Sequence, residues 1–216
     1  LESIADNARD IDFAMRWGYG WTTGPFEIWQ SAGWQQVATW SLVFGLKAPA
    51  VRCYERILAA DPDDARALAS MGFQLAQQDR LREALARFDR VAQLLPDSVD
   101  SHYNRAFLLQ KLNDHDAALE AFSRALAISP DHDLALYGKA LSLISLKRLD
   151  EAVPPLERNT KLQPMSPYGW YQLGRVQFDR GKPEKTQAII DRLAKFEPKV
   201  AAQLARETGL KAPPRP

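Results

Sequence analysis

The sequence has little cysteine and no excess of charge of either sign. Its single cysteine, Cys53, excludes an internal disulfide and a cysteine-rich metal site, and it fits a reducing compartment. We expect it to pack as a small hydrophobic residue. The 28 lysines and arginines nearly balance the 27 aspartates and glutamates, which leaves a formal net charge of +1. Because no broad electrostatic field is available to hold a polyanion, we expect no nucleic-acid partner.

Long apolar runs are also absent. The best candidate for a membrane span, residues 37–46, is broken by two hydroxyl residues and a glycine, and it is well short of the about 20 residues required. Hydrophobic residues make up 46% and charged residues 25% of the chain, the balance of an ordinary folded domain. No basic segment leads into an apolar one after Leu1, as it would in a signal peptide, so we expect a cytoplasmic protein unless a signal or anchor was removed upstream.

Prolines recur at a fixed interval of 34 residues, and other residue types follow the same interval. The prolines are Pro62, Pro96, Pro130, Pro164 and Pro198. A column of small residues contains Gly72, Ala106, Ala140 and Gly174, and a column of bulky ones contains Phe88, Phe122, Leu156 and Ile190. Small residues that meet bulky ones at fixed spacing are typical of closely packed helix pairs. Apolar residues between Asn113 and Leu126 also recur at helical offsets.

The turns between these helices carry proline followed by residues that cap helix N-termini, such as Asp64 and Ser98. With Trp170 and Leu173-Gly174 at their characteristic spacing, the 34-residue pattern resembles the tetratricopeptide repeat (TPR) family. The resemblance implies an all-α fold, a right-handed superhelical solenoid of helix–turn–helix pairs with an N-terminal helical segment and a C-terminal capping helix. The helix pairs should begin within about two residues of Asp64, Ser98, His132 and Ser166.

This pattern divides the chain into five parts. We expect an N-terminal helical segment at 1–33, a degenerate first repeat at 34–64, four TPR repeats at 65–198, a capping helix at 199–209 and a disordered tail at 210–216. The degenerate repeat should consist of helices at 34–44 and 50–61. One local conflict lies in the third repeat, because Pro154 and Pro155 fall where its second helix should already be running. We expect that helix to start late, near Val153, or to kink.

Residues 1–33 have a different composition, dense in aromatics and glycine. The run from Asp10 to Trp29 contains Gly18-Tyr19-Gly20 and then Gly24-Pro25-Phe26-Glu27, and it resembles the C-terminal helical domain of 3-hydroxyacyl-CoA dehydrogenases over residues 1–37. The sequence departs from that family at Gln30, where an aspartate is usual. We interpret Glu27 as a carboxylate in the first turn of a helix, and we expect the aromatics to form a small core or a surface for self-association.

The chemistry of the resembled dehydrogenases is missing. No glycine-rich strand–turn–helix is present to hold a dinucleotide, and the His–Glu pair of that family has no counterpart. The three histidines, His102, His115 and His132, lack ligand spacing, which favours surface or capping roles over a metal site. We therefore expect no enzyme activity, no cofactor and no metal.

Two functions follow. The first is a protein–protein interaction scaffold that binds a partner peptide or helix in the concave TPR groove. The alternative is a non-catalytic C-terminal piece of a fatty-acid β-oxidation 3-hydroxyacyl-CoA dehydrogenase fused to a TPR scaffold. A junction between unrelated pieces near residues 30–48 is a third alternative.

The resemblance implies that the fifth residue of each repeat's first helix points into the groove, and this column contains three tyrosines. The predicted binding residues are Tyr103, Asn104, Phe107, Tyr137, Tyr171 and Arg175. Tyrosines suit binding because they combine a large contact area with a polar tip, although they could instead pack between neighbouring helices. Of the positions at which the family grips a C-terminal carboxylate, only Asn104 matches, which argues against binding of chaperone tails. We expect an apolar or aromatic peptide segment as the ligand.

Overall fold

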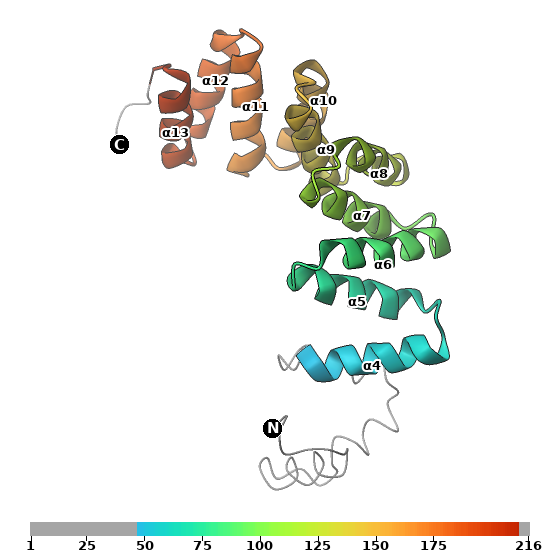
Figure 1. Cartoon of the computed structure of the whole chain (residues 1–216). Coiled ribbons are helices and arrows are strands. Elements are labelled where there is room, and N and C mark those ends of the chain that lie inside the picture. Colours follow the sequence, from blue (N-terminus) through green and yellow to red (C-terminus); the bar gives the residue numbers. More distant parts are fainter. Residues whose placement is uncertain (1–46, 212–216) are drawn as a thin grey trace, which may run out of the picture. The chain divides into compact units, whose positions relative to one another are not determined.

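The computed structural model describes residues 47–211, with side chains from residue 51 onward, and every regular element in that range is a helix (Figure 1). The helices are α4 (Lys47–Ala60), α5 (Ala65–Gln77), α6 (Leu81–Leu94), α7 (Val99–Lys111), α8 (His115–Ile128), α9 (Asp133–Ser145), α10 (Leu149–Leu162), α11 (Pro167–Asp179), α12 (Pro183–Leu193) and α13 (Pro198–Thr208). None of these helices is long and apolar enough to cross a membrane. The described residues form two compact units, which divide between Leu94 and Leu95.

The helix starts follow the predicted register. The first helices of the four pairs begin at Ala65, Val99, Asp133 and Pro167, each one residue after its predicted cap. The side chains of Asp64, Ser98 and His132 accept hydrogen bonds from the amide three residues on. These bonds satisfy an N–H group that has no acceptor within the helix. The prediction of the register is confirmed.

The turn inside each pair also repeats. One residue adopts a left-handed backbone at the same place in every pair, with φ of 60° at Asp79, 62° at Asn113, 60° at Lys147 and 71° at Gly181. Only the last of these is a glycine, the residue that tolerates this conformation most readily. The turn geometry is therefore imposed by the two helices that it joins rather than by residue type.

In the first unit, α5 packs between α4 and α6. Cys53 and Tyr54 of α4 are buried against Ala67 and Met71 of α5, so Cys53 packs as a hydrophobic residue, as predicted. Helix α4 begins at Lys47 rather than at residue 50, and it accommodates Pro49 because the first amides of a helix need no intrahelical acceptor. The predicted helix at 34–44 lies outside the described residues.

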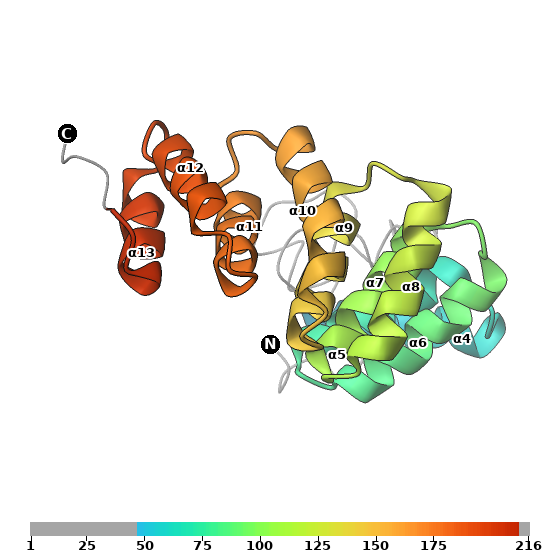
Figure 2. The same ribbon diagram turned by 90° about the horizontal axis from the view of Figure 1, so that it is seen from above.

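In the second unit, α7 pairs with α8, α9 with α10, and α11 with α12, while α13 packs on α11 and α12. Figures 1 and 2 both show α11, α12 and α13 side by side. The core combines residues of the small and bulky columns with those of α13, and it includes Ala140, Leu156, Leu173, Ile190 and Leu204. Burial of these side chains holds the pairs together, since a single pair has only one apolar face to bury.

Glycine and alanine let neighbouring helices approach closely, both within a pair and between successive pairs. Ala106 and Ala140 are fully buried. A Cβ atom on Gly138 would lie 2.3 Å from Cζ of Phe122, a distance that side chains do not reach. Because Phe122 is itself fully buried, the ring has no space into which to move.

The expectation of a late start for α10 is wrong. The helix begins at Leu149 and runs unbroken through Pro154 and Pro155 to Leu162. Its inward face buries Ala152 and Leu156 completely, and that burial requires a helix from the first turn onward. Pro154 is exposed and Pro155 is half-buried, so the rings lie away from the most buried part of the core.

The capping helix α13 ends at Gly209, whose φ of 68° is the left-handed conformation of a C-terminal cap. The chain beyond it is held for two further residues. The amide of Leu210 donates to the carbonyl of Ala205, and the Gln187 side chain exchanges two hydrogen bonds with the backbone of Lys211, of 3.1 and 3.2 Å. Residues 210–211, expected in the disordered tail, are thus bonded to the body, and 212–216 lie outside the described residues.

Candidate functional site

The three tyrosines of the predicted groove lie half-buried in the second unit, on α7, α9 and α11. Tyr103 is the most enclosed by other rings. Its ring centroid is 5.1 Å from that of His132, 6.2 Å from that of Phe122 and 6.5 Å from that of Phe107. Burial, and then the charge of Asp133, raises the pKa of its hydroxyl above the ordinary value. Tyr103 therefore packs between α7 and the start of α9 and stays protonated at neutral pH.

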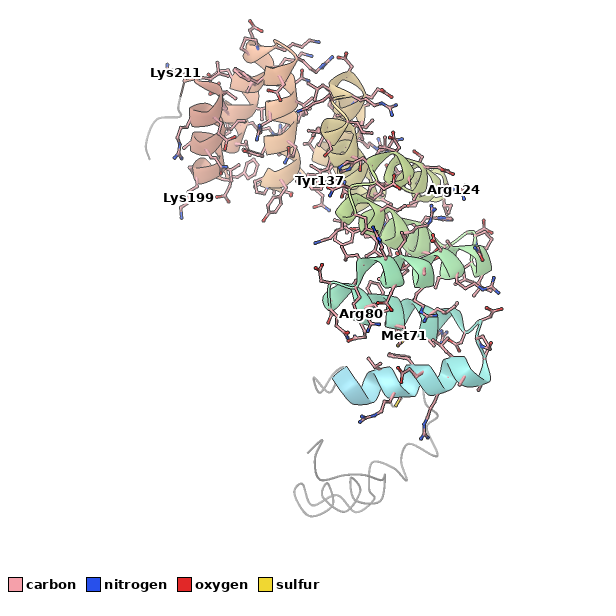
Figure 3. All side chains as sticks on the ribbon, in the orientation of Figure 1. Met71, Arg80, Arg124, Tyr137, Lys199 and Lys211 are labelled. Carbon is pink, nitrogen blue, oxygen red and sulfur yellow. The ribbon has the colours of Figure 1, made fainter. Side chains whose placement is uncertain are left out.

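Tyr137, labelled in Figure 3, occupies the same position one repeat later, on α9. It packs against the core cluster, hydrogen-bonds the side chain of Gln172 on α11 and lies close enough to Tyr168 to interact with it electrostatically. Burial is the main reason why the pKa of its hydroxyl is raised. Tyr103 thus reaches the N-cap of α9, and Tyr137 reaches α11, the first helix of the following pair.

Tyr171 reaches α13 instead of a further repeat. Its hydroxyl donates to Oε2 of Glu207 over 2.6 Å, and Nε2 of Gln203 lies 3.5 Å from the same hydroxyl. Arg175 forms an ion pair of 3.8 Å with Glu207. Hydrogen bonds from Tyr171 and Gln203 lower the pKa of Glu207 below its ordinary value. Two of the predicted binding residues, Tyr171 and Arg175, are therefore already bonded within the chain.

These helices expose more apolar residues than the sequence analysis predicted for the binding site. Four large side chains are exposed beside the tyrosines: Phe107 (41%), Leu134 (53%), Tyr168 (70%) and Phe178 (36%). They lie three, four or seven residues from the tyrosine of their own helix, so they share its face. We call the surface formed by Tyr103, Phe107, Leu134, Tyr137, Tyr168, Tyr171, Arg175 and Phe178 the tyrosine face.

Sequence reasoning found Phe107 but missed Leu134, Tyr168 and Phe178. The second position of the first helix, which holds Leu134 and Tyr168, is one turn before the tyrosine column, so helical spacing alone could have found both. Asn104 is half-buried on α7, one turn from Phe107. In the first unit, Ala69 stands in the tyrosine column, and Phe73 is 48% exposed with its ring edge-on to Phe88.

Two histidines have structural roles at the repeat boundaries. His132 caps α9 through Nδ1, as predicted. His102 was expected at the surface or in a cap but is buried, and its Nε2 is hydrogen-bonded to the carbonyl oxygen of Pro96 over 2.7 Å. Trp170 makes the same kind of bond two helix pairs further on, where its Nε1 donates to the carbonyl of Pro164 over 3.0 Å. Within residues 47–211, no cluster of His, Cys, Asp or Glu could hold a metal ion.

Comparison with known proteins agrees with this architecture. The tetratricopeptide repeat family model matches residues 99–132, the pair α7–α8. Residues 99–132 therefore match a tetratricopeptide repeat, and the all-helical fold of residues 47–211 is that of a TPR solenoid.

Solved structures of similar fold are known at low sequence identity. A crystal structure of the MamA protein superposes with a TM-score of 0.71 at 18% identity, covering 84% of this chain and 96% of that one. MamA from Desulfovibrio magneticus RS-1 gives 0.71 at 20% identity, covering 76% and 93%. YrrB, described as a TPR protein with an unusual peptide-binding site, gives 0.72 at 20% identity, covering 82% and 90%. At these identities the likeness establishes the fold alone.

A sequence relative of a different kind supports the second resemblance. A probable 3-hydroxyacyl-CoA dehydrogenase of Bacillus subtilis (strain 168) is 53% identical over 38 residues, 18% of this chain. The match spans only 5% of the length of that dehydrogenase.

Proposed function

We propose that the protein is an interaction scaffold that binds an apolar or aromatic segment of a partner protein on the tyrosine face. The observation that carries this proposal is the exposure of Phe107, Leu134, Tyr168 and Phe178 next to the half-buried tyrosines. Large apolar side chains left exposed on successive helices cost free energy in water unless a partner covers them. Aromatic side chains, which are enriched in protein interfaces, lose little entropy on binding.

The position of this surface also supports the proposal. It lies on the first helices of three successive pairs, where the resemblance to TPR proteins implies a peptide-binding groove. The peptide-binding site of YrrB shows that a protein of this fold can bind a peptide. A micromolar affinity, about −8 kcal/mol, is reasonable for a segment bound on such a surface.

The test uses the two most exposed residues of the tyrosine face. Peptides selected from a random displayed library on the wild-type protein should bind at least about tenfold more weakly to the double variant Leu134→Ser/Tyr168→Ser, measured by calorimetry. Both side chains are more than half exposed, so their replacement should leave the melting temperature nearly unchanged. Met165, which is 68% exposed in the turn before α11, provides the control variant Met165→Ser. Equal affinities for the two variants would contradict the proposal.

A second function, a piece of a dehydrogenase, is favoured by the 38-residue match. In that case the purified chain would still not bind NAD or oxidise a 3-hydroxyacyl-CoA, since the residues that do both in the dehydrogenases have no counterparts here. An upstream coding sequence with a glycine-rich strand–turn–helix would favour this second function over the scaffold.

A further inference from the structure

We propose that Glu207 is an internal ligand of the tyrosine face. Its carboxylate occupies the place that an acidic side chain of a bound peptide would take. This inference rests on the proposed function. Binding of an acidic segment at the α11 end would then require Glu207 to leave Tyr171 and Arg175.

The geometry at the α11 end is that of carboxylate recognition. The two carboxylate oxygens of Glu207 accept from Tyr171 over 2.6 Å and from Gln203 over 2.9 Å, with the guanidinium of Arg175 3.8 Å away. Neutral donors together with one cation are a suitable set for an ionised carboxylate, because hydrogen bonds to charged groups are the stronger ones. The lowered pKa of Glu207 agrees with this arrangement.

Glu207 is not needed to dock the capping helix. Helix α13 is held by Ala201, Leu204 and Ala205, which are buried against the core. Glu207 itself lies at the surface, where its side chain remains 35% exposed and that of Arg175 remains 52% exposed. Such an exposed ion pair contributes little to stability, so it can be exchanged for an equivalent pair with a partner at small cost.

The apolar part of the tyrosine face begins next to this cluster. Tyr168 and Phe178 stand on the same helix as Tyr171 and Arg175, and both are exposed. A peptide that covers them with apolar side chains would place its neighbouring residue at the Tyr171–Arg175 pair. The partner chemistry that fits is an apolar segment with an aspartate or glutamate beside it.

The experiment compares peptides selected from one random displayed library on the wild-type protein and on the variant Glu207→Gln. The variant removes the internal charge, so its selected peptides should be enriched in aspartate and glutamate next to apolar residues. The best of them should bind the variant at least about tenfold more tightly than the wild type. Its version with asparagine in place of aspartate should bind both proteins equally. Glu120→Gln, which makes the same charge change at an exposed pair with Arg124 on α8, should behave as the wild type.

Two results would overturn the inference. The first leaves the proposed function intact, and the second contradicts it as well. If both proteins select the same apolar peptides without acidic enrichment, Glu207 is not a competitor, and the proposed function stands. If no selected peptide is sensitive to Leu134→Ser/Tyr168→Ser, the proposed function fails as well. Should Glu207→Gln loosen α13, seen as faster amide exchange over residues 198–208, Glu207→Asp replaces it. The shorter side chain withdraws the carboxylate from Tyr171, so peptides selected on this variant should show the same enrichment in aspartate and glutamate.

Discussion

Replacing both prolines of α10 by alanine should stabilise the second unit. In an alanine variant, the amides of residues 154 and 155 can donate to the carbonyls of Asp150 and Glu151, four residues earlier. The side chains of these two acids are already fixed by Arg180 and Arg148, so the first turn of α10 is in place to accept the new bonds. Pro154 is exposed, and its replacement removes no buried contact.

The size of the effect follows from two opposing contributions. Each restored hydrogen bond contributes about 1 kcal/mol. The figure of about 3 kcal/mol for proline inside an isolated helix is an upper bound, because here the surrounding core already holds the helix in place. Each lost proline also loosens the unfolded chain, which costs about 0.4–1 kcal/mol. The net gain expected for Pro154→Ala/Pro155→Ala is up to about 1 kcal/mol, which corresponds to a rise in melting temperature of up to roughly 4 °C for a unit of this size.

Urea and thermal unfolding, followed by circular dichroism, measure this gain. The matched control is Pro130→Ala, in the turn before α9, where no helical hydrogen bond is restored and only the unfolded chain changes. That control should lose about 0.4–1 kcal/mol. A double variant that is no more stable than the wild type would show that α10 pays no penalty for its prolines, and the reasoning would be refuted.

Two further predictions concern the second unit. Gly138→Ala should destabilise it by about 1–2 kcal/mol in urea unfolding, because the clash of the new Cβ with the buried ring of Phe122 exceeds the gain in helix propensity; the exposed Ser145→Ala at the end of the same helix should be nearly neutral. Glu207 should titrate below the ordinary value for a glutamate in a carboxyl NMR titration, since Tyr171 and Gln203 bond its ionised form. The contribution of this contact to stability is present above the unfolded-state pKa and is lost as the pH falls through the lower folded-state pKa. A midpoint at or above the ordinary value would contradict the contact.

The sequence predicted the repeat architecture because the 34-residue period ties residue type to position at several columns at once. The caps at Asp64 and Ser98 follow from local chemistry, which a single sequence shows directly. The start of α10 could not be predicted in the same way, since local proline chemistry opposes the helix and only burial of Ala152 and Leu156 against neighbouring helices overrides it. The 34-residue period identifies where the helices begin. Where local proline chemistry opposes a helix, packing against neighbouring helices decides whether it forms.

The binding surface was predicted less completely than the fold. The tyrosine column is visible in the sequence, but its partners across helices are not. Nothing in the sequence places Glu207 against Tyr171, because the two are 36 residues apart and α13 lies outside the 34-residue pattern. The half-burial of the tyrosines also shows that they support the neighbouring helices, while the more exposed Leu134 and Tyr168 offer the free contact area.

Helix α13 also bears on whether copies of the protein can associate end to end. A stack of identical helix pairs can in principle add pairs at its end without limit, because each last pair presents the apolar surface that the next one covers. Here α13 covers that surface and turns Lys199, Gln203 and Arg206 outward, all exposed, with Lys199 near its start (Figure 3). Another helix docked there would have to dehydrate two cations and an amide with no apolar stripe in return. At this end of the second unit, α13 therefore disfavours head-to-tail association with another copy of the protein.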